Sequence, residues 1–189
     1  MLIRRATEAD AEAMRQIYNS EVTGSTATLD LVPRTAAEQT AWMAAHAGVY
    51  PVVVAIADGT APGPAGSSPG SGNGAAAPDG ASGAPGGALL GFASLSPYRP
   101  RPGYATAVED SIYVAAEHRG GGVGKDLLGE AVVLARDHGF HSIVARVVAE
   151  QPASVALHRA CGFELVGIER EIGRKFGRWL DVAILQRLH

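Results

Sequence analysis

The segment VEDSIYVAAEHRGGGVGKDLL, residues Val108–Leu128, carries the strongest structural signal in this 189-residue chain. A strand pattern ends near Val114, a glycine-rich turn follows over Arg119–Lys125, and an amphipathic helix begins after it. Because glycine has no Cβ, such a turn can bring several backbone N–H groups together, and the helix adds its own free N–H groups and positive dipole end. The turn can therefore hold a pyrophosphate. Three consecutive glycines are equally compatible with a plain tight turn between a strand and a helix.

Two other nucleotide-binding motifs fit this turn less well. A Walker loop requires Ser or Thr after its lysine, but Asp126 follows Lys125. A dinucleotide fold places its glycine turn after the first strand of a βαβ unit. Here the turn follows about the fourth strand. The sequence therefore favours neither a Walker loop nor a dinucleotide fold.

The hydrophobic pattern on either side of the turn predicts alternating strands and helices. Capping boxes at Thr7–Asp10 and Thr35–Glu38 open two helices, the glycine turn opens a third that stops at Gly139, and a fourth runs from Pro152 to Gly162. The expected strands are Leu2–Arg5, Val52–Ala57, Leu89–Leu95, Ala107–Val114, Ser142–Ala149, Phe163–Ile168 and Leu180–Gln186. This order predicts a mixed α/β (α+β) fold in which helices cover a central sheet.

The segment Gly59–Gly87 differs sharply in composition from the rest of the chain. Apart from Thr60, Asn73 and Asp79 it contains only Gly, Ala, Pro and Ser. Such a sequence buries too little apolar surface to offset the entropy of ordering it. We expect a flexible insertion within one domain, residues 1–189. A linker between two domains is the alternative, and it would leave a first part too short for a stable core.

Composition excludes several classes of partner. The net charge is −3 with acidic and basic residues interleaved, so no basic footprint for nucleic acid exists. No apolar run approaches the ~20 residues of a membrane helix, and no signal peptide is apparent at the N-terminus. Cys161 is the single cysteine, which indicates a reducing compartment. We expect a cytoplasmic protein that acts on a small polar molecule.

The glycine turn and several distant segments together resemble a known family. Val108–Leu128 is similar to the acetyl-CoA motif of the GNAT superfamily, R-x-x-G-x-G after an apolar strand. More narrowly, the chain resembles the phosphinothricin and methionine sulfoximine N-acetyltransferases over nearly its whole length, apart from the Gly59–Gly87 insertion. The segments that carry this likeness are Ile17–Asn19, Thr26–Thr28, Val108-Glu109, Ser111, Tyr113-Val114, Ala153-Ser154, Leu157-His158, Gly162-Phe163, Lys175–Asp181 and Gln186.

The resemblance implies a fold, a reaction and a set of cofactor contacts. The fold is a mostly antiparallel sheet of about six to seven strands with about four helices. The reaction is transfer of an acetyl group from acetyl-CoA to the amino group of a small amino-acid-like molecule, without a metal, in a homodimer. The implied cofactor-binding residues are Ile112, Tyr113, Val114, Arg119, Gly120, Gly121, Gly122, Val123, Gly124, Lys125, Gln151 and Ser154. The family usually has Asn at Gln151 and Arg at Ala105, which puts one cofactor contact and one substrate contact in question.

Two residues are candidates for proton transfer. An amine must lose its proton before it attacks a thioester, and Glu109 is the candidate base, directly or through a water. A structural contact of a half-exposed strand residue is the other interpretation. His158 occupies the position where many GNAT enzymes carry a tyrosine proposed to protonate the leaving thiolate, and imidazole can do so near pH 7. Packing beneath the cofactor is equally compatible with its position.

The expected acceptor site consists of Glu109 with Arg99, Asp110 and Ser111. A guanidinium at Arg99 could bind a substrate carboxylate in bidentate fashion, although surface arginines are common. Backbone N–H groups near Ile112–Val114 are expected to stabilise the oxyanion. The basic residues of Lys175–Trp179 fit a substrate entrance or a subunit contact. Two other functions remain open: a peptide N-terminal acetyltransferase, and a CoA-binding regulatory module without turnover.

Overall fold

The computed structural model describes residues 1–58 and 87–189. The predicted insertion therefore lies outside the described residues, except for Gly87. Seven strands form one sheet in the order β1-β2-β3-β4-β5-β7-β6. They are β1 (Leu2–Arg5), β2 (Val52–Ile56), β3 (Leu89–Pro97), β4 (Ala107–Val114), β5 (Ser142–Val148), β6 (Glu164–Lys175) and β7 (Arg178–Leu188). The pair β4–β5 is parallel and every other pair is antiparallel, which confirms the predicted mixed sheet.

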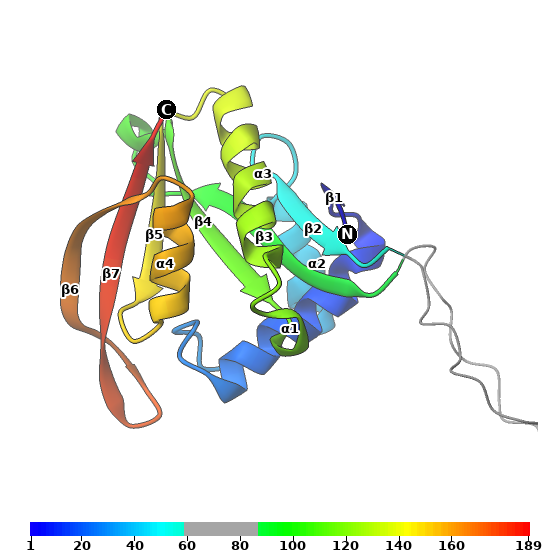
Figure 1. Cartoon of the computed structure of the whole chain (residues 1–189), viewed down its shortest axis with the longest axis horizontal. Coiled ribbons are helices and arrows are strands. Elements are labelled where there is room, and N and C mark those ends of the chain that lie inside the picture. Colours follow the sequence, from blue (N-terminus) through cyan, green and yellow to red (C-terminus); the bar gives the residue numbers. More distant parts are fainter. Residues whose placement is uncertain (59–86) are drawn as a thin grey trace, which may run out of the picture.

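Helices cover both faces of this sheet, as Figure 1 shows. On one face lie α1 (Ala11–Gly24) and α2 (Ala36–Ala45), whose apolar side chains pack on β2 and β3 around Met14 and Phe92. On the other face lie α3 (Val123–Asp137) and α4 (Pro152–Ala160), and the larger core forms between them and β2, β3, β4, β5 and β7. Strand residues alternate between these two cores with period two, as a sheet buried on both faces requires.

The helix signals in the sequence are confirmed with one correction. Thr35 opens α2 with a capping box in which its hydroxyl accepts from the Glu38 N–H at 3.2 Å. The capping box at Thr7 first opens a short 3-10 helix, Glu8–Asp10, and α1 begins only at Ala11. The carboxylate of Asp10 also bonds Arg4 of β1, which holds the chain in the tighter turn. Among the described residues no helix is both long and apolar enough to cross a bilayer.

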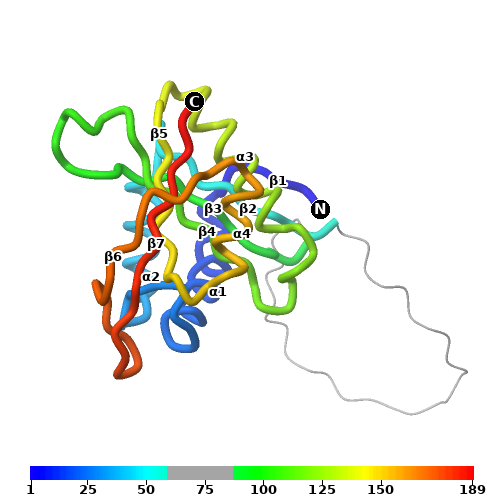
Figure 2. Tube along the Cα trace, turned by 60° about the vertical axis from the view of Figure 1, so that its left-hand side comes forward, coloured from blue at the N-terminus to red at the C-terminus, as the bar shows by residue number. Residues whose placement is uncertain are grey.

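The β6–β7 hairpin is longer than the sequence pattern predicts. The expected strands Phe163–Ile168 and Leu180–Gln186 extend to Glu164–Lys175 and Arg178–Leu188. Register shifts after Leu165 and after Glu169 break the apolar alternation, so the outer part of β6 carries no clear period-two signal. The hairpin closes at Phe176 and Gly177, both with positive φ, as a tight type I′ turn requires. In the trace of Figure 2 it extends away from the end of the sheet that carries β1.

Candidate active site

Strands β4 and β5 separate partway along their length. They pair only where Ala107–Glu109 faces Ser142–Val144. Beyond Glu109, β4 continues to Val114 with its other edge bonded to β3, and β5 continues to Val148 with its other edge bonded to β7. The edge of β4 over Ile112–Val114 therefore presents main-chain N–H and C=O groups to the gap, where an amide-containing ligand can bind as an additional strand.

The predicted glycine turn lies at the end of this gap. Gly120 and Gly122 have φ of +78° and +88°, which residues with a Cβ rarely adopt. Helix α3 begins directly after Gly122 with no side-chain cap, and its first main-chain bond runs from the Asp126 N–H to the Gly122 carbonyl. The N–H groups of Val123, Gly124 and Lys125 precede that bond and are free for an anion. These residues fit a diphosphate.

A cavity of about 680 Å³ joins the glycine turn to Glu109. That volume is within the usual range for a small-molecule site. With the exception of Gly121 and Arg99, every cofactor and acceptor residue expected from the sequence lines it. Its walls comprise Glu21, Ser25, Ala27, Thr28, Leu29, Glu109, Asp110, Ser111, Ile112, Tyr113, Val114, His118, Arg119, Gly120, Gly122, Val123, Gly124, Lys125, Ala145, Arg146, Val147, Val148, Gln151, Ala153, Ser154, Leu157, His158 and Val182.

Glu109 lies at the point where the two strands part. Its side chain is half-buried, and burial raises the pKa of its carboxyl above the usual value of 4.5 although Arg146 and Arg99 act in the opposite direction. A carboxylate with a raised pKa is a stronger base than one free in water. Its position and its environment are those that proton removal from an amine requires.

His158 and Asp110 form a buried pair in the wall of the cavity. The Nδ1 of His158 contacts the Ser154 carbonyl at 2.7 Å, and its Nε2 contacts Asp110 Oδ2 at 3.0 Å. Both partners offer oxygen atoms, so a protonated ring satisfies both contacts by donating from each nitrogen. Burial lowers the pKa of His158, but the hydrogen bond and charge of Asp110, with the Ser154 carbonyl, raise it overall.

This pair changes the expected roles of two residues. His158 has no free nitrogen for a leaving thiolate, so its geometry favours packing over proton donation. Asp110, expected beside the acceptor, alternates with Glu109 along β4 and turns to the face of α3 and α4. Its Oδ1 is buried without a partner among the described residues.

Arg119 bonds to α1, and Gln151 bonds to the segment after it. Arg119, expected near the phosphates, donates to the Glu21 carboxylate and, at 3.1 Å, to the Val114 carbonyl. The amide of Gln151 donates to Thr26 Oγ1 at 3.1 Å. These contacts, together with those of the buried Lys175, fix the segment Ser25–Asp30 over the cavity. The ammonium of Lys175 donates to the main-chain carbonyls of Glu21, at 3.3 Å, and Thr28, at 2.7 Å.

The structure places Arg146, and not the predicted Arg99, in the wall of the cavity. Arg99 is exposed outside the cavity, with its guanidinium 4.5 Å from the centre of the Tyr98 ring. Arg146 of β5, which sequence reasoning missed, lines the cavity instead. The signal in the sequence was a single charge within the otherwise apolar strand SIVARVV. Such a residue is rare in a buried strand without a partner or a function.

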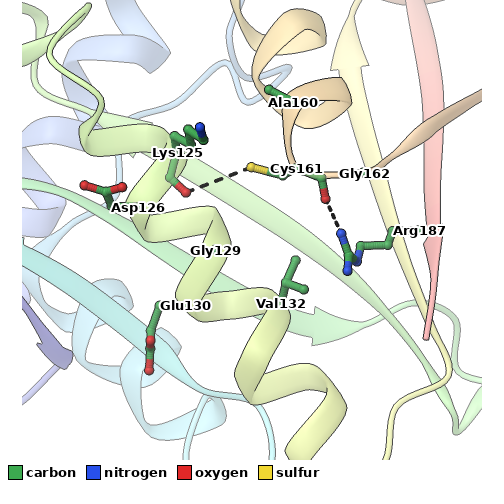
Figure 3. Close-up of a pocket in the computed structure, with 9 residues that line it drawn as sticks. All are labelled: Lys125, Asp126, Gly129, Glu130, Val132, Ala160, Cys161, Gly162 and Arg187. Carbon is green, nitrogen blue, oxygen red and sulfur yellow. Dashed lines mark hydrogen bonds between the residues drawn. The ribbon is translucent and has the colours of Figure 1, made fainter.

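Cys161 lies at the C-terminal end of α4 and does not line this cavity. It borders a second hollow of about 630 Å³ between α3, α4 and β7, together with Lys125 and Arg187 (Figure 3). Burial raises the pKa of its thiol, so the thiol remains protonated near neutral pH. A protonated thiol is a poor nucleophile. No cluster of metal-ligating side chains occurs within residues 1–58 and 87–189.

Comparisons with known proteins agree with this geometry. Residues 73–163 match the family described as the acetyltransferase (GNAT) family. The chain is 36% identical to an L-methionine sulfoximine/L-methionine sulfone acetyltransferase of Pseudomonas paraeruginosa, over 97% of this chain and 92% of the relative.

Solved structures share the fold. A phosphinothricin acetyltransferase of Sinorhizobium meliloti in complex with acetyl-CoA has a TM-score of 0.82 at 36% identity, over 99% of this chain and 87% of that one. A ribosomal-protein-alanine N-acetyltransferase of Brucella melitensis has a TM-score of 0.83 at 34% identity, over the whole of both chains. With its glycine turn, its parted strands and relatives that match over nearly its full length, the chain belongs to the GNAT family of acetyltransferases.

Proposed function

We propose that this enzyme transfers the acetyl group of acetyl-CoA to the amino group of a small amino-acid-like molecule of the methionine sulfoximine or phosphinothricin type. One observation carries the proposal: a single cavity connects the unpaired edge of β4, the free N–H groups after Gly122 and the carboxyl of Glu109. The names of the Pseudomonas and Sinorhizobium relatives support the acceptor class.

The two ends of the cavity suit the two parts of acetyl-CoA. The N–H groups of Gly120–Lys125 would hold the diphosphate, since a helix N-terminus carries partial positive charge. The main chain of Ile112–Val114 would pair with the amides of the pantetheine arm. Gln151 and Ser154 line the opposite wall, on α4 and its N-terminus. No metal enters this proposal.

Glu109 is proposed to accept the proton of the attacking amine, directly or through a water. The neutral nitrogen then attacks the thioester carbonyl, and main-chain N–H groups of β4 near Ile112–Val114 stabilise the negative charge that develops on its oxygen. Collapse of the tetrahedral intermediate then breaks the C–S bond of the thioester. The departing sulfur takes a proton that the nitrogen gives up, so this route needs no proton from His158.

A second candidate acceptor is the N-terminus of a peptide. The likeness to the Brucella structure, whose title names a ribosomal-protein-alanine acetyltransferase, favours this reading. The depth of Glu109 between parted strands, with Arg146 beside it, favours a small molecule instead. The third possibility is a binding module without turnover, for which a base such as Glu109 would have no use.

The acceptor class is tested by incubating the purified protein with acetyl-CoA and following release of the free thiol. The acceptors are methionine sulfoximine, methionine sulfone, phosphinothricin, ordinary amino acids and short peptides. Release with the first three supports the proposal, and release with peptides alone contradicts it in favour of the second candidate. Binding of acetyl-CoA without release on any acceptor supports the third.

We further propose that the enzyme is a cytoplasmic homodimer. The single cysteine agrees with a reducing compartment. Strand β6 is the edge of the sheet and no helix lies over its outer part in Figure 1. Apolar side chains of β6 and β7 are exposed there: Leu165 by 44%, Ile168 by 50%, Ile172 by 55% and Trp179 by 59%. A hairpin that exposes several large apolar side chains is typical of a subunit contact.

A further inference from the structure

Arg146 shares one face of the sheet with Glu109. In the parallel pair β4–β5, Glu109 lies opposite Val144, and Arg146 follows two residues later on β5. Residues two apart on a strand point to the same side, so both side chains emerge on the face of α1 and α2. Both line the same cavity.

Glu169 of β6 fixes the guanidinium of Arg146 from the side away from Glu109. Arg146 pairs with Ile184 of β7, and Glu169 pairs with the neighbouring Val182, so the ion pair crosses over β7. Arg146 Nη1 lies 3.4 Å from Glu169 Oε1, and its Nη2 bonds Oε2. A guanidinium has five N–H groups, and within the described parts of the chain only this carboxylate bonds it. Donors therefore remain for a ligand in the cavity.

The charge of Arg146 acts on the acid end of the cavity. The charge of Arg146 lowers the pKa of Glu109 more than the charge of Arg99 does. The lysine and the other arginine that line the cavity, Lys125 and Arg119, belong to the glycine turn. Arg119 is already paired with Glu21. At the acid end, Arg146 is the lining residue that offers positive charge to a second substrate group.

We propose that Arg146 binds the carboxylate of the acceptor while Glu109 receives its amine, and that Glu169 is a positioning residue for Arg146. This inference rests on the proposed function and assigns its specificity. An α-amino acid carries amine and carboxylate on one carbon, so two adjacent side chains of opposite charge recognise both. Arg146 then selects amines that carry an anionic group over simple amines or amides.

The test compares two acceptors that differ only in this charge: methionine sulfone and its primary carboxamide. Kinetics with each are measured for the wild type, Arg146→Gln, Arg146→Lys and Arg99→Gln. We expect Arg146→Gln to lose about 10- to 100-fold in kcat/KM with the acid, mostly through KM, and much less with the amide. Arg146→Lys keeps the positive charge but cannot form two parallel hydrogen bonds to a carboxylate. Its loss of kcat/KM with the acid should therefore be intermediate. Thermal melting and acetyl-CoA affinity show that each variant is folded.

Glu169→Gln separates positioning from a structural role. It removes the charge that orients Arg146, so we expect the KM for the acid to rise about 3- to 10-fold with kcat retained. The ratio of acid to amide activity should fall with it, and Glu169→Asp should restore part of that ratio. A lower melting temperature with an unchanged ratio would reduce Glu169 to a structural contact.

Three results overturn the assignment of Arg146. The first is an equal loss of kcat/KM with the acid and the amide in Arg146→Gln, and the second is no loss with either acceptor. The third is a preference for the acid that depends on Arg99 and not on Arg146. A wild type that acetylates none of the amino acids contradicts the proposed function itself. An active wild type with an unselective Arg146→Gln contradicts only this inference.

Discussion

His158 on α4 and Asp110 on β4 form a buried pair, with Nε2 and Oδ2 3.0 Å apart. Their side chains are only 4% and 1% exposed, so the pair joins helix and strand in an environment of low dielectric. The next residue of β4, on its opposite face, is Glu109. The same strand thus supplies a buried polar pair to one face and the proposed base to the other.

The His158–Asp110 pair makes stability depend on pH. A histidine whose pKa is raised by folding adds stability that is complete below its unfolded pKa, about 6.5, and is lost as pH rises through the folded value. We expect His158→Gln to lower the free energy of unfolding by about 3–5 kcal/mol at pH 6, because Asp110 is left buried and unpaired. The difference from the wild type should narrow toward pH 9 in urea titrations.

His141, which is exposed, provides the matched control for that measurement. His141→Gln should change stability by less than about 0.5 kcal/mol at every pH. A difference between wild type and His158→Gln that stayed constant from pH 6 to pH 9 would show that the ring is neutral in the folded protein.

Glu109 is expected to shape the pH–rate profile. At pH 7, Glu109→Gln should lower kcat/KM by about 10²- to 10³-fold, because the amine must then lose its proton to water. Its rate should increase with pH until the free amine predominates. In the wild type, a limb with an apparent pKa above 4.5 should appear at low pH, since burial raises the pKa of this carboxyl.

Glu164→Gln, at the exposed start of β6, is the control. Parallel profiles for wild type and Glu109→Gln would remove Glu109 from the role of base.

Lys175 is expected to couple the hairpin to the acceptor site. Lys175→Met leaves the carbonyls of Glu21 and Thr28 without their donor, and this should cost about 1–3 kcal/mol of stability. The loosened segment Ser25–Asp30 should raise the acceptor KM several-fold. Arg174→Met changes the neighbouring, exposed residue of β6 and should alter neither quantity. Equal effects of the two substitutions in denaturation and kinetics would contradict a specific role for Lys175.

The exposed apolar surface of β6 and β7 predicts the oligomeric state. Sedimentation velocity should give a dimer for the wild type, and Ile168→Glu should shift it to monomer because a charge would be buried in the contact. Val133→Glu tests the argument, since Val133 is also exposed, by 40%, but lies on α3. A monomeric wild type, or dissociation caused equally by both substitutions, would contradict the proposed contact.

Much of the fold could be predicted because most helices and strands here are marked by residues within or next to them. Glycines mark the ends of α3 and α4, and Thr35 caps α2 as its capping box predicts. The outer part of β6 could not be predicted, since bulges and alternating charges hide its period and pairing with β7 alone makes it a strand.

The site could be predicted only where a residue acts through its own position in the chain. Glu109 and the glycine turn are of this kind. The roles of Asp110 and His158 depend on each other across 48 residues, and Arg146 acquires its role from Glu169 on a strand two places away in the sheet. Such pairings follow from strand order and register, which local patterns do not contain.

The N–H groups after Gly122 are proposed to bind the diphosphate of acetyl-CoA. Calorimetry should detect one acetyl-CoA per chain, and no measurable binding of S-acetyl-N-acetylcysteamine, which lacks the diphosphate. Gly122→Ala forces a Cβ into a φ of +88° and should weaken acetyl-CoA binding about tenfold, whereas Gly129→Ala within α3 should not. No heat with acetyl-CoA, or equal affinity for the truncated thioester, would contradict the claim.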